Sequence, residues 1–172
     1  MKNLKSQEPA RELEVLCICG GFGFPFGSGS SARIIMVGKA LQMEGTGFRV
    51  LHCGPSPLKL NTDRAGVFEG IPFEYTTTVR RPSNIVARWL VYFWALLSLT
   101  LRLVKFRSYG RRVAIWLYMI NGPVNLYIGC LCRLLGLPFV QELCEWWPAH
   151  PACSSFTKGV YRSSHFWNST GG

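Results

Sequence analysis

Apolar residues along this chain occur either in short continuous runs, as in buried strands, or at helical spacing. Residues 13–19 form a short, mostly apolar run that stops at a pair of glycines, as a buried parallel strand does. After a loop rich in Gly, Phe and Ser, residues 32–43 carry an apolar stripe of Ile34, Val37 and Leu41 at helical spacing. A serine at the start and a Gly-Thr-Gly turn at the end are typical helix boundaries. The first segment therefore predicts a strand, a loop and a helix.

The same alternation continues through the rest of the sequence. Short connections between strands and helices predict right-handed βαβ units and a parallel sheet. We therefore predict an α/β fold with a Rossmann-like parallel sheet flanked by helices, made by residues 13–172 after a polar N-terminal extension of residues 1–12. The further strands are expected at 48–53, 70–77, 111–120 and 137–143, and the further helices at 84–106, 121–135 and 154–167.

Composition narrows the class of protein. The 172 residues are 48% hydrophobic and 16% charged, which suits one domain with a full core and excludes a disordered chain. The seven cysteines have neither zinc-finger spacing nor the even framework of a small secreted domain, so we expect reduced thiols and no metal site. The polar, acid-containing start lacks the apolar core of a secretory signal. We expect a cytoplasmic protein.

The net charge of +10 is unevenly distributed, because no acidic residue lies between Glu74 and Glu142. Within that stretch, residues 89–101 are uncharged and largely apolar, and basic residues flank them. A buried core helix fits this pattern, but the aromatic and basic flanks favour a helix lying on an anionic membrane surface; a spanning helix fits least well. The expected membrane contacts are Arg88, Trp89, Trp94, Arg102, Lys105 and Arg107. No nucleic-acid module is present, so we expect no nucleic-acid partner.

The glycine loop between the first strand and helix suggests contact with an anionic ligand. Glycines let a backbone approach a ligand closely, and the amides at a helix N-terminus favour an anion. Gly27-x-Gly29-x-x-Ala32 formally matches a dinucleotide pattern, but the strand ends too early and the next strand lacks a terminal acid. No Walker lysine follows, which excludes a P-loop. The phenylalanines of the loop are expected to pack inside the protein rather than stack on a substrate.

Two carboxylates lie at or just beyond the last predicted strand. Glu142 and Glu145 would stand at the ligand-binding edge of a parallel sheet, where a carboxylate can act as a general base or hold hydroxyl groups. A solvated carboxylate or an arginine partner is an equally good interpretation.

The order of these motifs resembles family 4 glycosyltransferases. The matching features are the glycine pair and Gly/Ser loop before Ala32-Arg33, the helix ending in Lys39-Ala40-Leu41, the strand Gly47–Leu51, and the stretch Val113–Pro138 with its Asn-Gly-Pro turn. The resemblance covers roughly residues 13–147. One departure is that members often carry a histidine after the strand corresponding to Val113–Tyr118, where this chain has none.

That resemblance implies half of a GT-B fold, the acceptor-side domain of a retaining, metal-independent enzyme that uses a nucleotide diphosphate sugar donor. It implies a sugar or lipid-linked acceptor and a second Rossmann-like domain, in cis or in trans, so the chain is expected to be incomplete at its C-terminus and inactive alone. The loop expected to meet donor or acceptor holds Gly20, Gly21, Ser28, Gly29 and Ser30. Two alternatives stay open: a stand-alone Rossmann-like nucleotide-binding module, and a non-catalytic membrane-associated subunit completed by a partner chain.

Overall fold

A six-stranded sheet forms the centre of the protein in a computed structural model that describes residues 13–27, 29–108, 112–119 and 122–142. The strand order is β3-β4-β2-β1-β5-β6, and all neighbours are parallel except β3 and β4. The strands are β1 (Glu14–Gly20), β2 (Gly47–His52), β3 (Ala65–Phe68), β4 (Ile71–Tyr75), β5 (Val113–Met119) and β6 (Phe139–Gln141). The helices are α1 (Gly29–Met43), α2 (Ile85–Ser108) and α3 (Gly122–Leu135). The predicted Rossmann-like α/β fold is confirmed.

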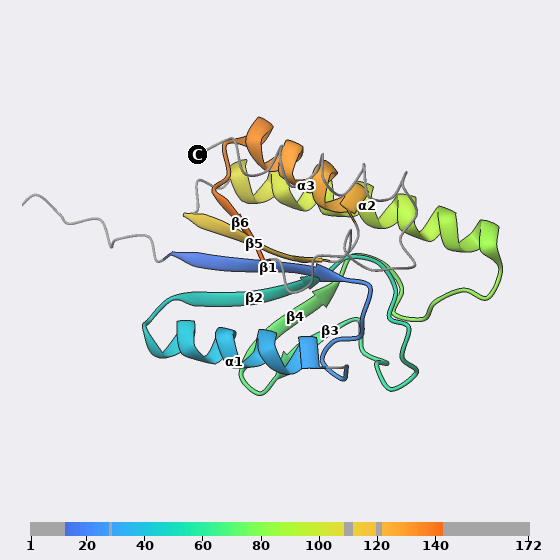
Figure 1. The fold of residues 1–172 in the computed structure, drawn as a ribbon, viewed down its shortest axis with the longest axis horizontal. Coiled ribbons are helices and arrows are strands. Elements are labelled where there is room, and N and C mark those ends of the chain that lie inside the picture. The colour runs from blue at the N-terminus through green and yellow to red at the C-terminus, as the bar shows by residue number, and fades with distance from the viewer. Residues whose placement is uncertain (1–12, 28, 109–111, 120–121, 143–172) are drawn as a thin grey trace, which may run out of the picture.

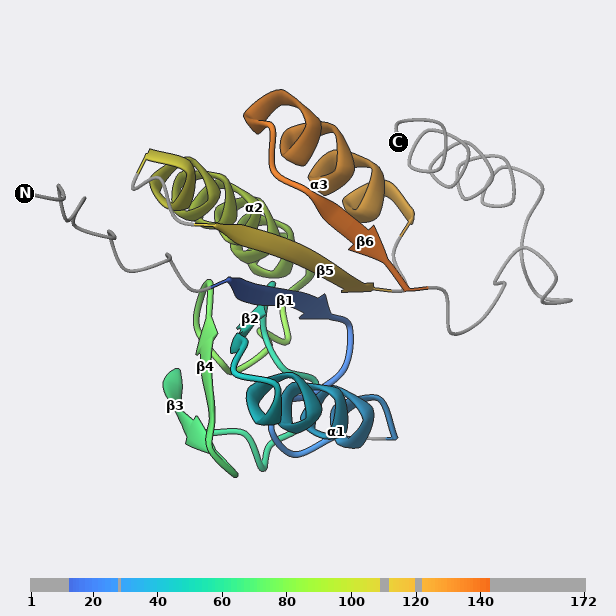
Figure 2. The same ribbon diagram turned by 90° about the vertical axis from the view of Figure 1, so that its left-hand side faces the viewer.

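Helices cover both faces of the sheet, α1 on one side and α2 with α3 on the other (Figures 1 and 2). The side chains of each strand alternate between the two faces. Cys17 and Cys19 of β1 therefore face the core beneath α1, whereas Leu16 and Ile18 face the core beneath α2 and α3. Because β1 is buried on both sides, its sequence is a nearly continuous apolar run, as the sequence predicted.

Two elements differ from the sequence prediction. Residues 65–68 form an antiparallel edge strand that was not predicted, because its side chains are mostly exposed and its sequence lacks an apolar alternation. The turn that follows has positive φ at both Glu69 and Gly70, as a tight two-residue hairpin requires.

Helix α1 begins at Gly29, three residues earlier than expected, and Ser31 lies inside it rather than capping it. The predicted helix at 154–167 lies outside the described residues.

Helix α2 is attached to the sheet along a narrow stripe. Asn84 caps its N-terminus, since its Oδ1 accepts hydrogen bonds from the amides of Val86 (2.8 Å) and Ala87 (3.3 Å). Of its 24 residues, only Ala95, Leu99 and Leu103 are fully buried. The alternative of a wholly buried core helix does not describe α2, although part of the helix does belong to the core.

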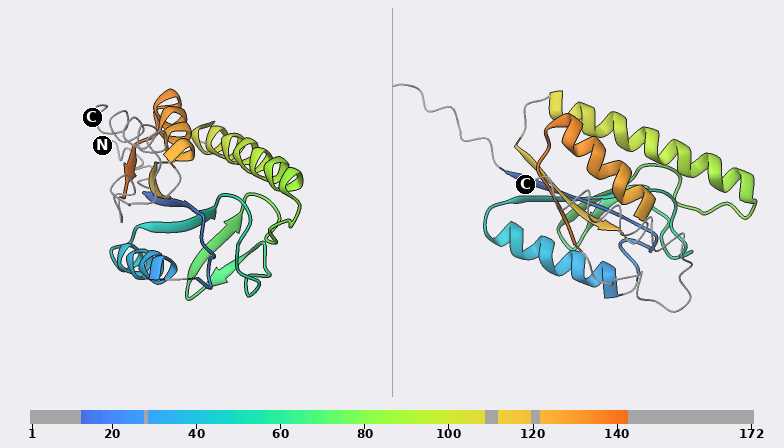
Figure 3. Two further views of the ribbon diagram at one scale, coloured as in Figure 1. Left: turned by 45° about the vertical axis from the view of Figure 1, so that its right-hand side comes forward. Right: turned by 45° about the horizontal axis from the view of Figure 1, so that its top comes forward.

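The opposite side of α2 is apolar and exposed. The N-terminal half of the helix projects beyond the carboxyl ends of the strands (Figures 1 and 3). By length and composition α2 is able to cross a membrane, with 17% of its most apolar window buried in the protein. We call its exposed apolar side the outer face of α2; it comprises Ile85, Val86, Trp89, Leu90, Phe93, Trp94, Leu97, Leu101 and Val104.

We predict that the buried stripe of α2 stabilises the domain and its outer face does not. Leu99→Ala should lower the free energy of unfolding by about 2–5 kcal/mol, because it removes a fully buried side chain and leaves a cavity. Leu90→Ala on the same helix, where the side chain is 65% exposed, should change it by less than about 0.5 kcal/mol. Urea denaturation of both variants measures this. Equal effects would show that α2 is not a layer of the domain.

Candidate functional site

The strand order identifies the edge of the sheet where a ligand is expected to bind. From β1 the chain crosses through α1 to β2 on one side, whereas β5 lies on the other side of β1 and is reached through α2 on the opposite face. The direction of winding therefore reverses between β1 and β5, whose last paired residues are Gly20 and Met119. Ligands of open α/β sheets bind at such a switch point, outside the carboxyl ends of the strands.

Hydrogen bonds hold the loop after β1 to α1, to β4 and to the loop between β2 and β3. Inside α1, Ser31 Oγ donates a hydrogen bond of 2.6 Å to the Gly23 carbonyl. From β4, the Tyr75 hydroxyl donates to the Phe24 carbonyl at 2.5 Å and accepts from the Phe24 amide at 3.2 Å. The buried Asn61 side chain pairs with both backbone groups of Phe26. These bonds satisfy the loop backbone internally and hold it in one shape.

The glycines of the loop fall into two groups. A side chain on Gly23 would meet Asn61 Nδ2 at 2.4 Å, and one on Gly27 would meet Ser31 Oγ at 2.0 Å, so both are needed for packing inside the protein. Around Gly21 and Gly29, in contrast, no atom of the described residues lies within 4 Å of a Cβ position. The open side of the loop is therefore at Gly21 and Gly29, next to the first turn of α1.

The structure places the other predicted loop residues as follows. Gly20 is buried as the last residue of β1, and Ser30 is half-buried in the first turn of α1. Ser28 lies outside the described residues. Of the loop phenylalanines, Phe22 and Phe24 are buried, and Phe26 is 47% exposed with its ring against Phe68. Phe22 and Phe24 therefore pack inside the protein as expected, whereas Phe26 does not.

His52 is a buried residue at this edge that the sequence analysis did not single out. Its Nε2 lies 2.5 Å from the Phe22 carbonyl and its Nδ1 lies 3.0 Å from the Gly54 carbonyl, so the ring joins the loop after β1 to the loop after β2. The Tyr75 ring lies against it at 4.4 Å between centroids. Burial lowers the pKa of His52, and the two carbonyls oppose that effect in part. A lone histidine in a strand has no spacing signal that would have identified it.

Glu142 is held by an arginine. Its Oε1 lies 2.6 Å from Arg33 Nη2, which joins the end of β6 to the first half of α1 across the carboxyl edge. Its amide donates to the Leu117 carbonyl. The interpretation of Glu142 as an arginine partner therefore describes its contact, and a catalytic role stays a prediction. Glu145 lies outside the described residues.

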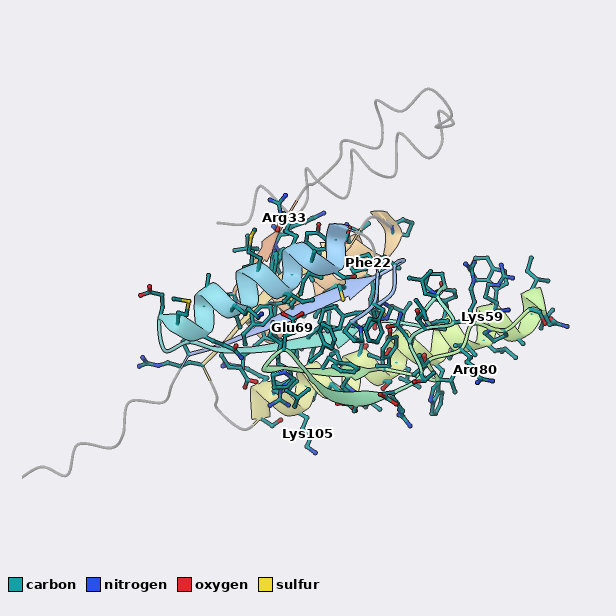
Figure 4. The ribbon with its side chains drawn as sticks, turned by 90° about the horizontal axis from the view of Figure 1, so that it is seen from below. Phe22, Arg33, Lys59, Glu69, Arg80 and Lys105 are labelled. Carbon is teal, nitrogen blue, oxygen red and sulfur yellow. The ribbon has the colours of Figure 1, made fainter. Side chains whose placement is uncertain are left out.

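Basic side chains gather where α2 projects from the sheet. Lys59 and Arg80 lie at the end of the molecule toward which the N-terminal half of α2 projects, and Lys105 points outward near the other end of the helix (Figure 4). Among the predicted membrane contacts, Trp89 is 72% exposed and Trp94 is 62% exposed. The remaining three are Arg88, which is half-buried and donates to the Ser83 carbonyl, Arg102, which pairs with Glu74, and Arg107, which is exposed.

The described part of the chain offers no metal site. It contains no group of three or more His, Cys, Asp or Glu side chains that could hold a metal ion. Its five cysteines, Cys17, Cys19, Cys53, Cys130 and Cys132, are free thiols, and all but Cys130 are buried. Burial raises the pKa of Cys53 to about 12, so its thiol stays protonated and serves as a small core residue.

We predict that His52 makes the stability of the domain depend on pH. Its pKa in the folded protein lies below the value of about 6.5 that it has when unfolded, so the unfolded chain binds more protons between the two values. The free energy of unfolding should fall as the pH drops below about 6.5, by at most about 1.4 kcal/mol per pH unit. Urea denaturation at pH 7.5 and pH 5.5 measures the change.

His52→Gln provides the control for this prediction. His150 and His165 are present in both proteins, so the difference between their pH profiles isolates His52. The variant should lose less stability between pH 7.5 and pH 5.5 than the original protein does. Identical profiles would contradict the account.

Comparison with known proteins found no match, whether to family models, to curated proteins or to solved structures. The fold assignment accordingly rests on the strand order and the helix layers of this chain. The edge between β1 and β5, with its fastened loop and the exposed start of α1, is the candidate functional site.

Proposed function

We propose that this chain is the acceptor-binding, Rossmann-like domain of a retaining glycosyltransferase that works at a membrane surface. In this proposal a sugar or lipid-linked acceptor binds at the carboxyl edge of the sheet. A nucleotide diphosphate sugar is the donor. A second Rossmann-like domain, in the same polypeptide or in a partner chain, would hold that donor, and the acceptor domain itself needs no cofactor. The sequence resemblance to family 4 glycosyltransferases suggests the reaction.

The observation that carries the proposal is the open start of α1 at the switch point. Backbone amides at a helix N-terminus favour an anionic group, such as the phosphate of a donor or of a lipid-linked acceptor. Gly21 and Gly29 leave space there, while the bonds to Ser31, Tyr75 and Asn61 keep the loop in a fixed position. Because hydrogen bonds already hold the loop in place, the loop loses little conformational entropy when a ligand binds on its open side.

Helix α2 supports the membrane part of the proposal. The helix passes beside the carboxyl edge, because the Tyr92 ring lies against Gly54 just after β2. Exposed basic residues such as Lys59, Arg80 and Arg81 lie before the helix in the sequence, and no acidic residue occurs within it. An apolar helix face with basic flanks is typical of a segment that lies in the interface of an anionic membrane. A lipid-linked acceptor would then reach the ligand edge from the same membrane.

Glu142 and Glu145 remain the proposed catalytic carboxylates. For Glu142, the contact with Arg33 keeps the carboxylate at the ligand edge, where it could accept a proton or a hydroxyl hydrogen bond.

The alternative of a dinucleotide-binding module receives less support from the geometry. The first glycine of the Gly27-x-Gly29-x-x-Ala32 pattern is explained by its packing against Ser31 and Gly23. Strand β2 ends in the buried His52. A dinucleotide-binding fold usually has an Asp or Glu at this position, which accepts a hydrogen bond from the ribose hydroxyl.

We expect the chain to bind a lipid-linked monosaccharide in anionic nanodiscs, detected by saturation transfer from the protein to the sugar protons. Gly29→Leu should abolish the transfer, because its side chain would occupy the ligand edge, where a Cβ on Gly29 meets no described atom within 4 Å. The control Ala40→Leu, an exposed position of α1 far from that edge, should leave the transfer unchanged. Absence of sugar signals together with tight, Gly29-dependent binding of NADH would contradict the proposal.

A further inference from the structure

A second hollow lies on the α2 side of the sheet, away from the ligand edge. It has a volume of about 530 Å³ and is enclosed by α2 together with strands β1, β2 and β4. This volume falls within the ordinary range of about 300–1,000 Å³ for small-molecule sites. The floor is formed by Leu16 and Leu51 of the sheet, and one wall by Leu97, Leu101 and Phe106 of α2.

The hollow and the outer face of α2 share residues. Trp94, Leu97 and Leu101 line the hollow and are also exposed, at 62%, 39% and 63% respectively. An apolar chain lying along the outer face could therefore enter the hollow without crossing a polar barrier. Such a continuous apolar surface favours an elongated apolar ligand over a compact polar one.

The hollow has a positively charged lining. Among the described residues, three cationic side chains line it, those of Arg49, Arg102 and Lys105, against the single carboxylate of Glu74. Glu74 is held by Arg102 in two hydrogen bonds of 2.5 and 2.6 Å, which lower its pKa and keep it charged. Glu14 lies 3.1 Å from Arg49, and the cations still outnumber the carboxylates when Glu14 is included. The excess positive charge fits an anionic head group.

We propose that this hollow binds one acyl chain of an anionic membrane lipid, with the phosphate of that lipid at Arg49, Arg102 and Lys105. This inference rests on the membrane-surface part of the proposed function. The lipid is a bound anchor and not the acceptor, because the hollow lies on the α2 face of the sheet, over Leu16, Arg49 and Leu51, whereas the ligand edge lies beyond the carboxyl ends of the strands. The domain would thus hold a membrane lipid at one place and bind the acceptor at another.

The test uses single-chain amphiphiles below their micelle-forming concentrations, so that no membrane is present. Spin-labelled dodecyl phosphate should bind saturably, one per chain, and quench the fluorescence of Trp94, which lines the hollow. Trp94→Phe should remove most of the quenched signal. Trp89→Phe, an exposed residue of the same helix outside the lining, should leave the quenching in place. Dodecylphosphocholine should bind more weakly, and inorganic phosphate should not compete at equal concentration.

Two charge variants separate a specific site from general attraction. Lys105→Gln should weaken the binding of dodecyl phosphate about fivefold, as expected for one cation near an anionic group. Arg107→Gln removes the same charge two residues away, where the side chain does not line the hollow, and should change the affinity less than twofold. Equal losses in both variants would overturn the proposal.

A third variant fills the hollow. Ser98→Phe places a ring in the lining and should abolish saturable binding, with an unchanged melting temperature as evidence that the domain still folds. No saturable binding of dodecyl phosphate by the original protein would overturn the proposal. So would concentration-dependent dimerisation that Ser98→Phe abolishes, because a second copy of the chain would then occupy the hollow.

Failure of the lipid site and failure of the proposed sugar binding give different results in these experiments. Dodecyl phosphate carries no sugar, and its binding is read at Trp94 rather than at the ligand edge. If Gly29→Leu abolishes sugar binding but Ser98→Phe has no effect on dodecyl phosphate, the proposed function holds and the lipid site is wrong. The reverse pattern, in which Ser98→Phe abolishes binding and no sugar binds, would support the lipid site and contradict sugar transfer.

Discussion

The packing of α2 on the sheet through a single narrow stripe determines what the rest of the protein can do. Ala95, Leu99 and Leu103 complete the core over β1 and β5, and that core keeps the helix attached to the domain. Because only this stripe packs on the sheet, the opposite side of the helix is exposed to solvent, although it is also apolar. A soluble domain would normally cover or replace such a surface, because water-exposed apolar area promotes association. In the proposed account an anionic membrane covers it.

A second constraint acts at the carboxyl edge of the sheet. The loop after β1 carries no regular structure, so its backbone groups need partners from elsewhere. Tyr75, Ser31 and Asn61 supply those partners from three different elements, and His52 adds a link between two loops. The result is a fixed loop whose free side is the start of α1. The ligand edge and the outer face of α2 lie next to each other because both begin where the strands end.

Much of the fold could be predicted because its strands are buried in a simple way. Apolar runs bounded by glycine predicted β1, β2 and β5, and the Gly-Pro pair at Gly122 predicted the start of α3. The edge strand β3 was missed, since exposed residues such as Val67 need no apolar alternation. Helix α2 was ambiguous because a helix that is apolar all round gives no sign of which side is buried. The contacts of His52 and Glu142 join residues far apart in sequence, and spacing alone cannot reveal them.

The depth of α2 in a membrane tests the central claim most directly. Spin labels at Leu90 and Phe93 of the outer face, with Val67 of β3 as an exposed reference, would be measured on anionic vesicles by their accessibility to oxygen and to a water-soluble nickel complex. The account predicts that both helix labels lie about 5–10 Å below the head groups while the reference stays in water. Helix labels that remain as accessible to the nickel complex as the reference would contradict it.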